Sequence, residues 1–262
     1  MGTRLPSVTV TLPAGLADLI DAATLRLREA VAAHAPAVFT SSFGVEDMVV
    51  LDLIARAGLD VELVTLDTGR LHEETYQLMA TTRETYGRPV IAMYPEAQTL
   101  QAFVAKQGIN PFYESIELRK RCCEIRKMEP LAKALRDKGL WVTGLRREQS
   151  VTRAALDVLA RDEAHGLMKL NPIVEWTQAD VWAYAEAFGV PTNPLHQRGF
   201  PSIGCAPCTR AIEPGEDPRA GRWWWEQAET RECGLHMTPD GRLVRAVKPA
   251  PADPMAESAR QA

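Results

Sequence analysis

Short apolar runs alternate with amphipathic stretches along most of the chain. Residues 16–33 place apolar side chains at helical spacing on one face and charged side chains opposite, which predicts an opening helix. Four β-forming runs follow, AVFTSSFG, VELVTLDTG, PVIAMYP and LWVTGLR. Further helices are expected from Glu46 to Gly58, from about Leu71 to Tyr86, from Thr99 and from Met128. This alternation is typical of an α/β fold with a mostly parallel sheet and helices on both faces.

Three polar loops follow strands of this predicted sheet: SSFGVED, LDTGR and GLRREQS. Ligands bind beyond the carboxyl ends of parallel strands, so we expect the loops to meet at one crevice. The first loop opens a helix, where backbone amides attract phosphate, although serines there are more often simple caps. The second loop is equally readable as an ordinary turn. The candidate binding residues in these loops are Ser41, Ser42, Gly44, Asp67, Thr68, Gly69, Arg146 and Arg153.

The chain changes character at about Pro191, where irregular sequence rich in proline and glycine begins. We expect residues 1–248 to form one α/β domain, in which 191–248 are a mobile lid segment. Residues 249–262 have no apolar periodicity and are expected to be a disordered tail.

Composition narrows the class of protein. The chain has 262 residues, of which 46% are hydrophobic and 24% charged, as in ordinary soluble proteins. No run approaches the ~18 apolar residues of a membrane helix, and the start MGTRLPSVTV lacks a signal-peptide core. We therefore expect a cytoplasmic protein without a membrane partner. The net charge of −4 argues against nucleic acid as a partner but allows local basic patches.

Five cysteines divide into two pairs and one single residue. Cys122 and Cys123 are adjacent, Cys205 and Cys208 form a CxxC, and Cys233 stands alone. In a reducing compartment this odd number indicates four ligands and one spare thiol rather than disulfides. Spacing alone leaves structural zinc and a [4Fe-4S] cluster equally open, with unliganded buried thiols as a weaker alternative.

Basic residues surround the first cysteine pair in the run RKRCCEIRK. A cluster held by four thiolates carries negative charge, so these cations favour the iron-sulfur alternative. Arg119 and Lys120 are expected on a solvated helix face. Lys127 follows Cys123 by four residues on the same helical face and is the candidate to point at the cluster.

Cys233 lies between Arg231 and His236. Cationic neighbours lower the pKa of a thiol toward the nucleophilic thiolate, although an inert free cysteine is the alternative. Arg219 and Arg222 precede it, and guanidinium groups suit phosphate and sulfate oxyanions. With no carboxylate base standing out, this pattern predicts thiolate attack on a dianionic or trianionic substrate.

The motifs SSFGVED, LDTGRLHEETYQ, CCEIRK, GLRREQS, GCAPCTR and RECGLH together resemble the phosphoadenylyl- and adenylyl-sulfate reductase family of sulfate assimilation. The resemblance covers roughly Phe39 to Met237, and the pattern CC…CxxC is similar to the iron-sulfur branch. It implies an adenine nucleotide α-hydrolase-like fold. The first loop departs from the SGGxDS pattern of ATP pyrophosphatases, so ATP hydrolysis is not expected.

The resemblance also implies a mechanism and a set of site residues. Cys122, Cys123, Cys205 and Cys208 would ligate a [4Fe-4S] cluster, and Cys233 would attack the sulfur of adenosine 5′-phosphosulfate, releasing AMP. A thioredoxin or a glutaredoxin-like donor would then release sulfite from the S-sulfocysteine. The residues that match positions around the phosphosulfate are Lys127, Arg153, Arg219, Arg222 and His236, and those that match the phosphate loop are Ser41, Ser42 and Gly44.

Two other functions stay open from the sequence. The first is a reductase that prefers the 3′-phosphorylated substrate. The second is a zinc-stabilised nucleotide-binding module without redox turnover. The sequence does not specify the oligomeric state, which leaves a homo-oligomer open.

Overall fold

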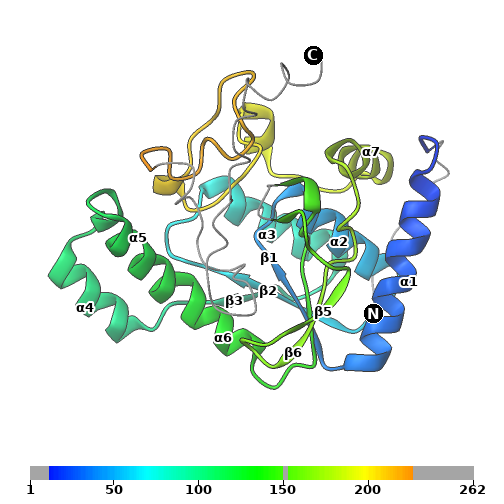
Figure 1. Cartoon of the computed structure of the whole chain (residues 1–262), viewed down its shortest axis with the longest axis horizontal. Coiled ribbons are helices and arrows are strands. Elements are labelled where there is room, and N and C mark those ends of the chain that lie inside the picture. Colours follow the sequence, from blue (N-terminus) through cyan, green and yellow to red (C-terminus); the bar gives the residue numbers. More distant parts are fainter. Residues whose placement is uncertain (1–11, 150–152, 227–262) are drawn as a thin grey trace, which may run out of the picture.

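The computed structural model describes residues 12–149 and 153–226, and its centre is a six-stranded sheet of order β3-β2-β1-β4-β6-β5 (Figure 1). All neighbouring strands run parallel except β5 and β6, which are antiparallel. The strands are β1 (Ala37–Ser41), β2 (Val61–Leu66), β3 (Ile91–Met93), β4 (Leu140–Val142), β5 (Leu159–Asp162) and β6 (Leu167–Leu170). The mostly parallel α/β sheet predicted from the sequence is confirmed, as are its first four strands.

Seven α-helices and several shorter helical turns surround this sheet in the described ranges. The α-helices are α1 (Leu16–His34), α2 (Val45–Arg56), α3 (Glu73–Tyr86), α4 (Ala97–Gln107), α5 (Ile116–Cys123), α6 (Glu129–Leu135) and α7 (Gln178–Phe188). A π-helix, η2 (Glu124–Met128), joins α5 to α6. The 3-10 turns are η1 (Pro111–Tyr113), η3 (Arg147–Gln149), η5 (Pro194–Arg198) and η6 (Ala206–Cys208).

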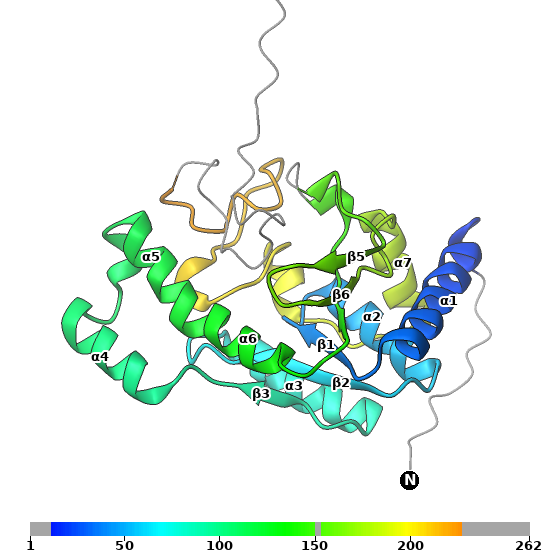
Figure 2. The same ribbon diagram turned by 60° about the horizontal axis from the view of Figure 1, so that its bottom comes forward.

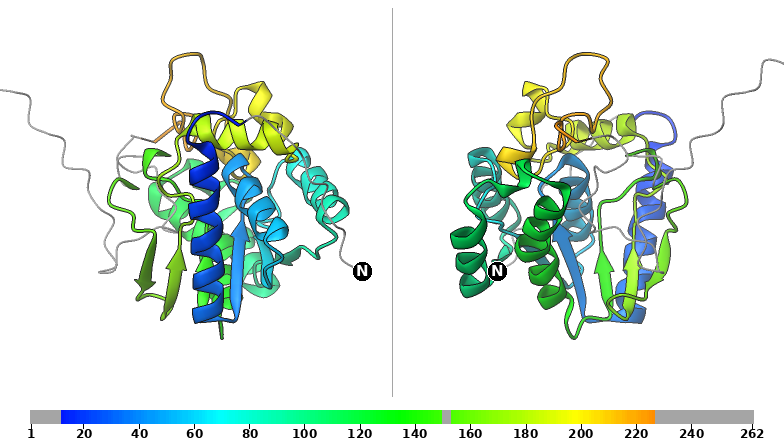
Figure 3. Two further views of the ribbon diagram at one scale, coloured as in Figure 1. Left: turned by 90° about the vertical axis from the view of Figure 1, so that its right-hand side faces the viewer. Right: turned by 60° about the vertical axis from the view of Figure 1, so that its left-hand side comes forward.

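Successive residues of the central strands pack on opposite faces of the sheet. Val38 and Trp141 contact one apolar cluster with Leu131 of α6, whereas Phe39 belongs to the larger cluster that includes Leu51 of α2. Figure 3 shows α1 along one side of the sheet and the green helices α5 and α6 on the other. Because both faces are covered, the central strands are apolar at most positions instead of alternating, as expected for parallel sheets.

The structure contains two features that the apolar pattern does not predict, the β5–β6 hairpin and α7. Both strands of the hairpin are four residues long, and β5 alternates between exposed and half-buried residues, so it lacks an apolar run. A local signal does mark α7: Thr177 and Asp180 form a reciprocal capping box at its start. The spacing Thr-x-x-Asp was therefore readable from the sequence.

The irregular segment that begins at about Pro191 packs over the sheet as far as it is described. Figures 1 and 2 show this segment, in yellow and orange, above the sheet and beside α5. Ala206 N donates to Arg70 O at 2.8 Å, and an isolated antiparallel bridge joins Thr209 to Arg222. Its expected mobility stays a prediction. In the described ranges, no helix is long and apolar enough to cross a membrane.

Candidate active site

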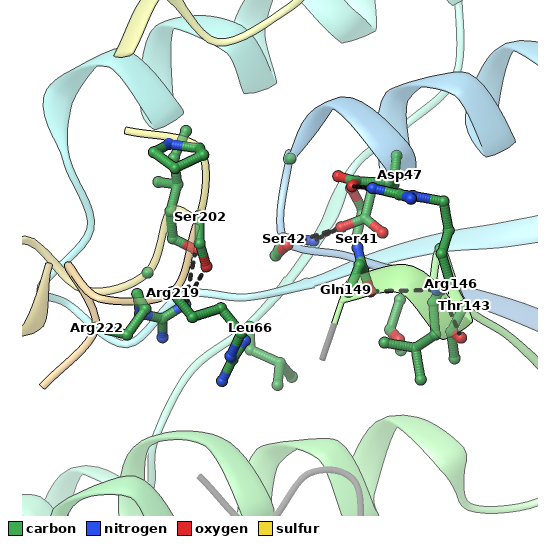
Figure 4. A pocket seen from close by; sticks show the side chains of 18 of the residues that line it. Ser41, Ser42, Asp47, Leu66, Thr143, Arg146, Gln149, Ser202, Arg219 and Arg222 are labelled. Atoms are coloured by element: carbon green, nitrogen blue, oxygen red, sulfur yellow. Dashed lines mark hydrogen bonds and ion pairs between the residues drawn. The ribbon is translucent and has the colours of Figure 1, made fainter. Parts of the chain in front are cut away.

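A cavity of about 540 Å³ lies where the three polar loops meet the segment from His196 to Trp223 (Figure 4). Residues 40–47, 65–71 and 143–149 contribute to its wall, each at the carboxyl end of a parallel strand. The predicted meeting of the three loops at one crevice is confirmed. Figure 4 shows Ser202, Arg219 and Arg222 on one side of the cavity and Ser42, Asp47 and Arg146 on the other.

The loop after β1 is held by hydrogen bonds within the loop. Ser41 Oγ accepts from Phe43 N at 3.1 Å, and Asp47 Oδ2 accepts from both Ser42 N and Ser42 Oγ. Phe43 has φ 61°, in the left-handed region. Gly44 is the N-cap of α2 and lines the cavity, so the serines stabilise the loop instead of capping the helix.

Of the residues predicted in the loop after β2, one lines the cavity and two do not. Thr68 lines the cavity, and its Oγ1 lies 3.3 Å from the Sγ of Cys205. Asp67 and Gly69 are not part of the cavity wall. Asp67 Oδ1 accepts from Gly69 N and from Tyr76 Oη, both at 2.8 Å. Asp67 and Gly69 thus make local turn contacts, and their role in binding stays a prediction.

The loop after β4 carries two buried arginines at the cavity. Arg146 forms ion pairs of 2.8 Å with both Glu46 and Glu148. Arg153 donates to Gln149, which also lines the cavity. The Arg146 guanidinium is thus already opposed by two carboxylates, which weakens its attraction for a bound anion.

Arg219 and Arg222 lie on the opposite side of the cavity (Figure 4), and Lys127 lines the cavity close enough to Cys205 to act on it, as Arg222 does. Arg222 Nη1 donates to Ser202 Oγ at 3.2 Å and to Ile203 O at 3.3 Å, which fixes the guanidinium at the wall. A Cβ at position 204 would collide with this guanidinium, so any residue other than glycine would displace it. Cationic side chains from two distant segments therefore meet at the cavity.

Lys127 reaches the cavity from the π-helix η2. The sequence predicts that it lies four residues after Cys123 on one α-helical face. Residues 124–128 instead have the wider π-helical turn, and the charge of Lys127 acts on Cys205. Such π-helical turns are often found at functional sites.

The four paired cysteines gather in one buried cluster beside the cavity. Cys123, Cys205 and Cys208 are buried with Phe112 and Trp223, and Cys122 packs against them. Cys205 also lines the cavity. In residues 12–149 and 153–226, no three His, Cys, Asp or Glu side chains are arranged to hold a metal ion.

The surroundings of these thiols shift their pKa values in opposite directions. Burial, together with neighbouring Cys205, raises the pKa of Cys208 to about 12. Burial also opposes ionisation of Cys205, but the positive charge of Lys127 and the hydrogen bond with Thr68 outweigh it and lower the pKa. The thiol at the cavity wall is therefore the more readily ionised of the two.

Two predicted site residues, Cys233 and His236, lie outside the described residues. Their roles as nucleophile and substrate contact stay predictions. The last described residue, Glu226, lies seven positions before Cys233 in the sequence and contacts α5 through an ion pair with Arg119.

The expectation for Arg119 was wrong. Its side chain is fully buried, and its Nε and Nη2 each donate to a Glu226 carboxylate oxygen at 2.8 Å. Lys120, the next residue, is exposed as expected. The basic run RKRCC looks uniformly polar, and the partner of Arg119 is 107 residues away, so no local pattern could separate these two side chains.

The cavity also holds carboxylates that were not among the predicted site residues. Glu46, Asp47 and Glu148 all line it. Burial raises the pKa of Asp47 to about 6, against the opposing effect of its hydrogen bonds from Ser42. The motif SSFGVED contained the signal, since Glu46 and Asp47 follow the loop glycine after a single valine.

Comparison with known proteins identifies the relatives of this chain. Residues 36–211 match the model of the phosphoadenosine phosphosulfate reductase domain. The chain is 56% identical over 205 residues to adenosine 5′-phosphosulfate reductase of Burkholderia cepacia, covering 78% of this chain and 82% of that protein. It is 48% identical over 234 residues to the enzyme of the same name from Allochromatium vinosum, covering 89% and 90%.

Solved structures confirm the predicted adenine nucleotide α-hydrolase-like fold. Phosphoadenylyl-sulfate reductase from Candida auris, in complex with phosphate, matches with a TM-score of 0.61 at 26% identity, covering 78% of this chain and 99% of that one. FMN adenylyltransferase of Candida glabrata, at 15% identity and a TM-score of 0.54 over 78% of this chain and 68% of its own, shares the fold alone. By its matched domain and its relatives, this chain belongs to the phosphoadenosine phosphosulfate reductase domain family.

Proposed function

We propose that the protein reduces adenosine 5′-phosphosulfate to sulfite and AMP, with thioredoxin as the electron donor. The names of its relatives support the substrate and the reaction. The observation that carries the proposal is that Lys127, Arg219 and Arg222 line the cavity beside the buried cysteines. Guanidinium and ammonium groups placed there suit a phosphosulfate group.

The charge of the cavity favours the less charged of the two sulfonucleotides. Among the described residues, its wall holds five cationic side chains: Lys127, Arg146, Arg153, Arg219 and Arg222. It also holds four carboxylates: Glu46, Asp47, Glu148 and Asp217. This near balance suits the dianionic 5′-phosphosulfate, whereas a 3′-phosphate would add further negative charge to a cavity that already holds four carboxylates. A reductase that prefers the 3′-phosphorylated substrate is therefore the second candidate.

In the proposed reaction, the Cys233 thiolate attacks the sulfate sulfur. A sulfur-sulfur bond forms, the bond from that sulfur to the AMP oxygen breaks, and AMP leaves with the electron pair. The cationic side chains of the cavity oppose the negative charge that builds up on the departing phosphate. A thioredoxin thiolate then attacks Cys233 Sγ and expels sulfite, and the second thioredoxin thiol releases Cys233 by forming the thioredoxin disulfide.

Cys122, Cys123, Cys205 and Cys208 would hold a [4Fe-4S] cluster, and their chemistry fits this group. All four are thiols, and they share one buried cluster with cations nearby. When bound, the cluster would hold the two cysteine-bearing segments together beside the cavity. The thiolate attack itself would be carried out by Cys233, assisted by the cationic side chains of the cavity.

Sulfite and AMP formation with purified protein and thioredoxin tests the proposal. The expected result is equimolar sulfite and AMP from adenosine 5′-phosphosulfate, with a lower kcat/KM for the 3′-phosphorylated substrate. The reverse order of kcat/KM supports the second candidate. Stoichiometric zinc without acid-labile sulfide, together with no turnover of either substrate, would show a nucleotide-binding module instead.

A further inference from the structure

A buried ion pair joins the two segments that carry the paired cysteines. Arg119 of α5 has no exposed surface, and the Glu226 side chain is 3% exposed. Two hydrogen bonds of 2.8 Å connect them in the fork geometry of a guanidinium and a carboxylate. Burial of two charges is unfavourable, and replacing such a pair by apolar side chains is often neutral, so stability alone gives little reason for it.

The pair is directly connected to both pairs of cysteines. Cys122 and Cys123 follow Arg119 by three and four residues in the same helix. On the other side, Glu226 N donates to Trp223 O at 2.8 Å, and Trp223 N donates to Cys208 O at 3.1 Å. The buried pair thus fixes α5 against the backbone of the CxxC segment.

Trp223 extends this connection to the substrate cavity. Its ring lies 4.9 Å from the Arg119 guanidinium carbon and 4.8 Å from that of Arg222. Both contacts are of cation–π type, and Trp223 itself is 1% exposed. Because Arg222 lines the cavity, a shift of the Trp223 ring would move a cationic side chain of the cavity as well.

We propose that Arg119 and Glu226 are positioning residues that hold the four cysteines together, and Arg222 in the cavity, before any metal centre is assembled. This role deepens the proposed function, because it concerns the thiols that would bind the cluster and the guanidinium that would bind the substrate. Neither residue touches the reacting atoms. They act through Trp223 and through the backbone of Cys208.

The test compares Glu226→Gln with a matched control in the same segment. Glu226→Gln keeps the shape of the side chain and removes its charge. The control is Glu216→Gln, because Glu216 also forms a two-pronged ion pair at 2.8 Å, with Nη1 and Nη2 of Arg210, but at the surface. Surface pairs contribute little, so every measurement on the control is expected within about twofold of the wild type.

Three measurements are made: iron release to a chelator, the reaction rate of cysteines with a thiol reagent in iron-stripped protein, and KM for adenosine 5′-phosphosulfate. In Glu226→Gln we expect iron release and thiol reaction to accelerate at least about tenfold, because Arg119 is left buried without its charged partner. KM should rise more than kcat falls, since Arg222 is displaced. Values within twofold of the wild type in all three would overturn the proposal.

Arg119→Lys keeps the test decisive if Glu226→Gln does not fold. Lysine preserves the charge but loses the two-pronged contact, so smaller changes in the same directions are expected. Unchanged thiol reactivity and KM in a folded Arg119→Lys protein would also contradict the proposal. A wild-type protein without iron would count against the proposed cofactor, whereas thiol reactivity of the iron-free chain would still test the role of the pair.

Discussion

Asp47 accepts two hydrogen bonds from Ser42, at 2.6 Å from the backbone nitrogen and 2.8 Å from Oγ. Both bonds favour the ionised carboxylate, yet burial has the larger effect and raises the pKa to about 6. A carboxyl group that titrates near pH 6 therefore forms part of a cavity proposed to bind an anion. Its protonation state should influence both the binding of the substrate and the stability of the fold.

Substrate affinity should increase as Asp47 becomes protonated. Below pH 6 the carboxyl group is neutral, so the cavity loses one negative charge and attracts the phosphosulfate more strongly. In Cys233→Ser, which cannot turn over, affinity for adenosine 5′-phosphosulfate should rise about three- to tenfold between pH 7.5 and pH 5. Calorimetric titration at both pH values measures this affinity. Adding Asp47→Asn should remove most of this pH dependence. An unchanged pH profile in the double variant would show that another group causes the pH dependence.

The same carboxyl group should affect folding stability in a defined pH range. Its pKa is raised from 3.8 in an unfolded chain to about 6 in the fold, so the folded state binds the proton more tightly. This favourable contribution is complete below pH 3.8 and disappears as pH rises through 6. Asp47→Asn should therefore raise Tm relative to the wild type more at pH 7 than at pH 4. Thermal unfolding at both pH values checks this, and a larger difference at pH 4 would contradict it.

Asp47 should also contribute to discrimination between sulfonucleotides. Asp47→Asn removes a negative charge from a cavity whose wall nearly balances cations with carboxylates. The ratio of kcat/KM for the 3′-phosphorylated substrate to that for adenosine 5′-phosphosulfate should increase about three- to tenfold. Asp60→Asn, which changes an exposed carboxylate outside the cavity wall, is the control and should leave the ratio unchanged.

Gly44 offers a test of the loop after β1 that separates binding from folding. Its φ of −71° suits any residue, and a Cβ there would meet nothing closer than 3.7 Å in the protein. Gly44→Ala should therefore change the free energy of unfolding by less than about 1 kcal/mol. A methyl group in the cavity wall should nevertheless weaken substrate binding about tenfold if phosphate approaches the backbone there. Unchanged KM would remove Gly44 from the binding site.

The cysteines should separate into two functional classes on substitution. Cys205→Ser removes one proposed ligand, and the protein should lose iron and acid-labile sulfide together with its brown colour. Cys233→Ser should retain both and yet release no sulfite. Iron and sulfide analysis together with a sulfite assay distinguishes the two variants. Equal iron content in both variants would show that Cys205 is not a ligand.

The sequence predicted the parts of this structure that local patterns encode. The apolar runs around Phe39 and Leu63 gave the central strands, and the paired cysteines indicated a common site before the fold brought them together. Arg119 shows the limit of that approach. Its burial depends on Glu226 and on the Trp223 ring, which only the folded chain places beside it. The hairpin of β5 and β6 escaped for a similar reason, since it is defined by pairing with β4 rather than by an apolar run of its own.

The predicted role of Lys127 toward the cluster stays a prediction, but the structure changes the local geometry on which it rested. Its spacing from Cys123 placed it toward the cysteines, and it does reach the cavity wall beside them. The π-helical turn of residues 124–128 was not readable, because no residue pattern distinguishes it from an α-helix.

The central claim is that Cys233 accepts the sulfonate group of the substrate. The most direct measurement is the mass of the intact protein after incubation with adenosine 5′-phosphosulfate in the absence of any reductant, followed by peptide mapping. The account predicts a gain of one sulfonate group, located on Cys233 and absent from Cys233→Ser. A sulfonate on another residue, or its persistence in Cys233→Ser, would contradict the proposed mechanism.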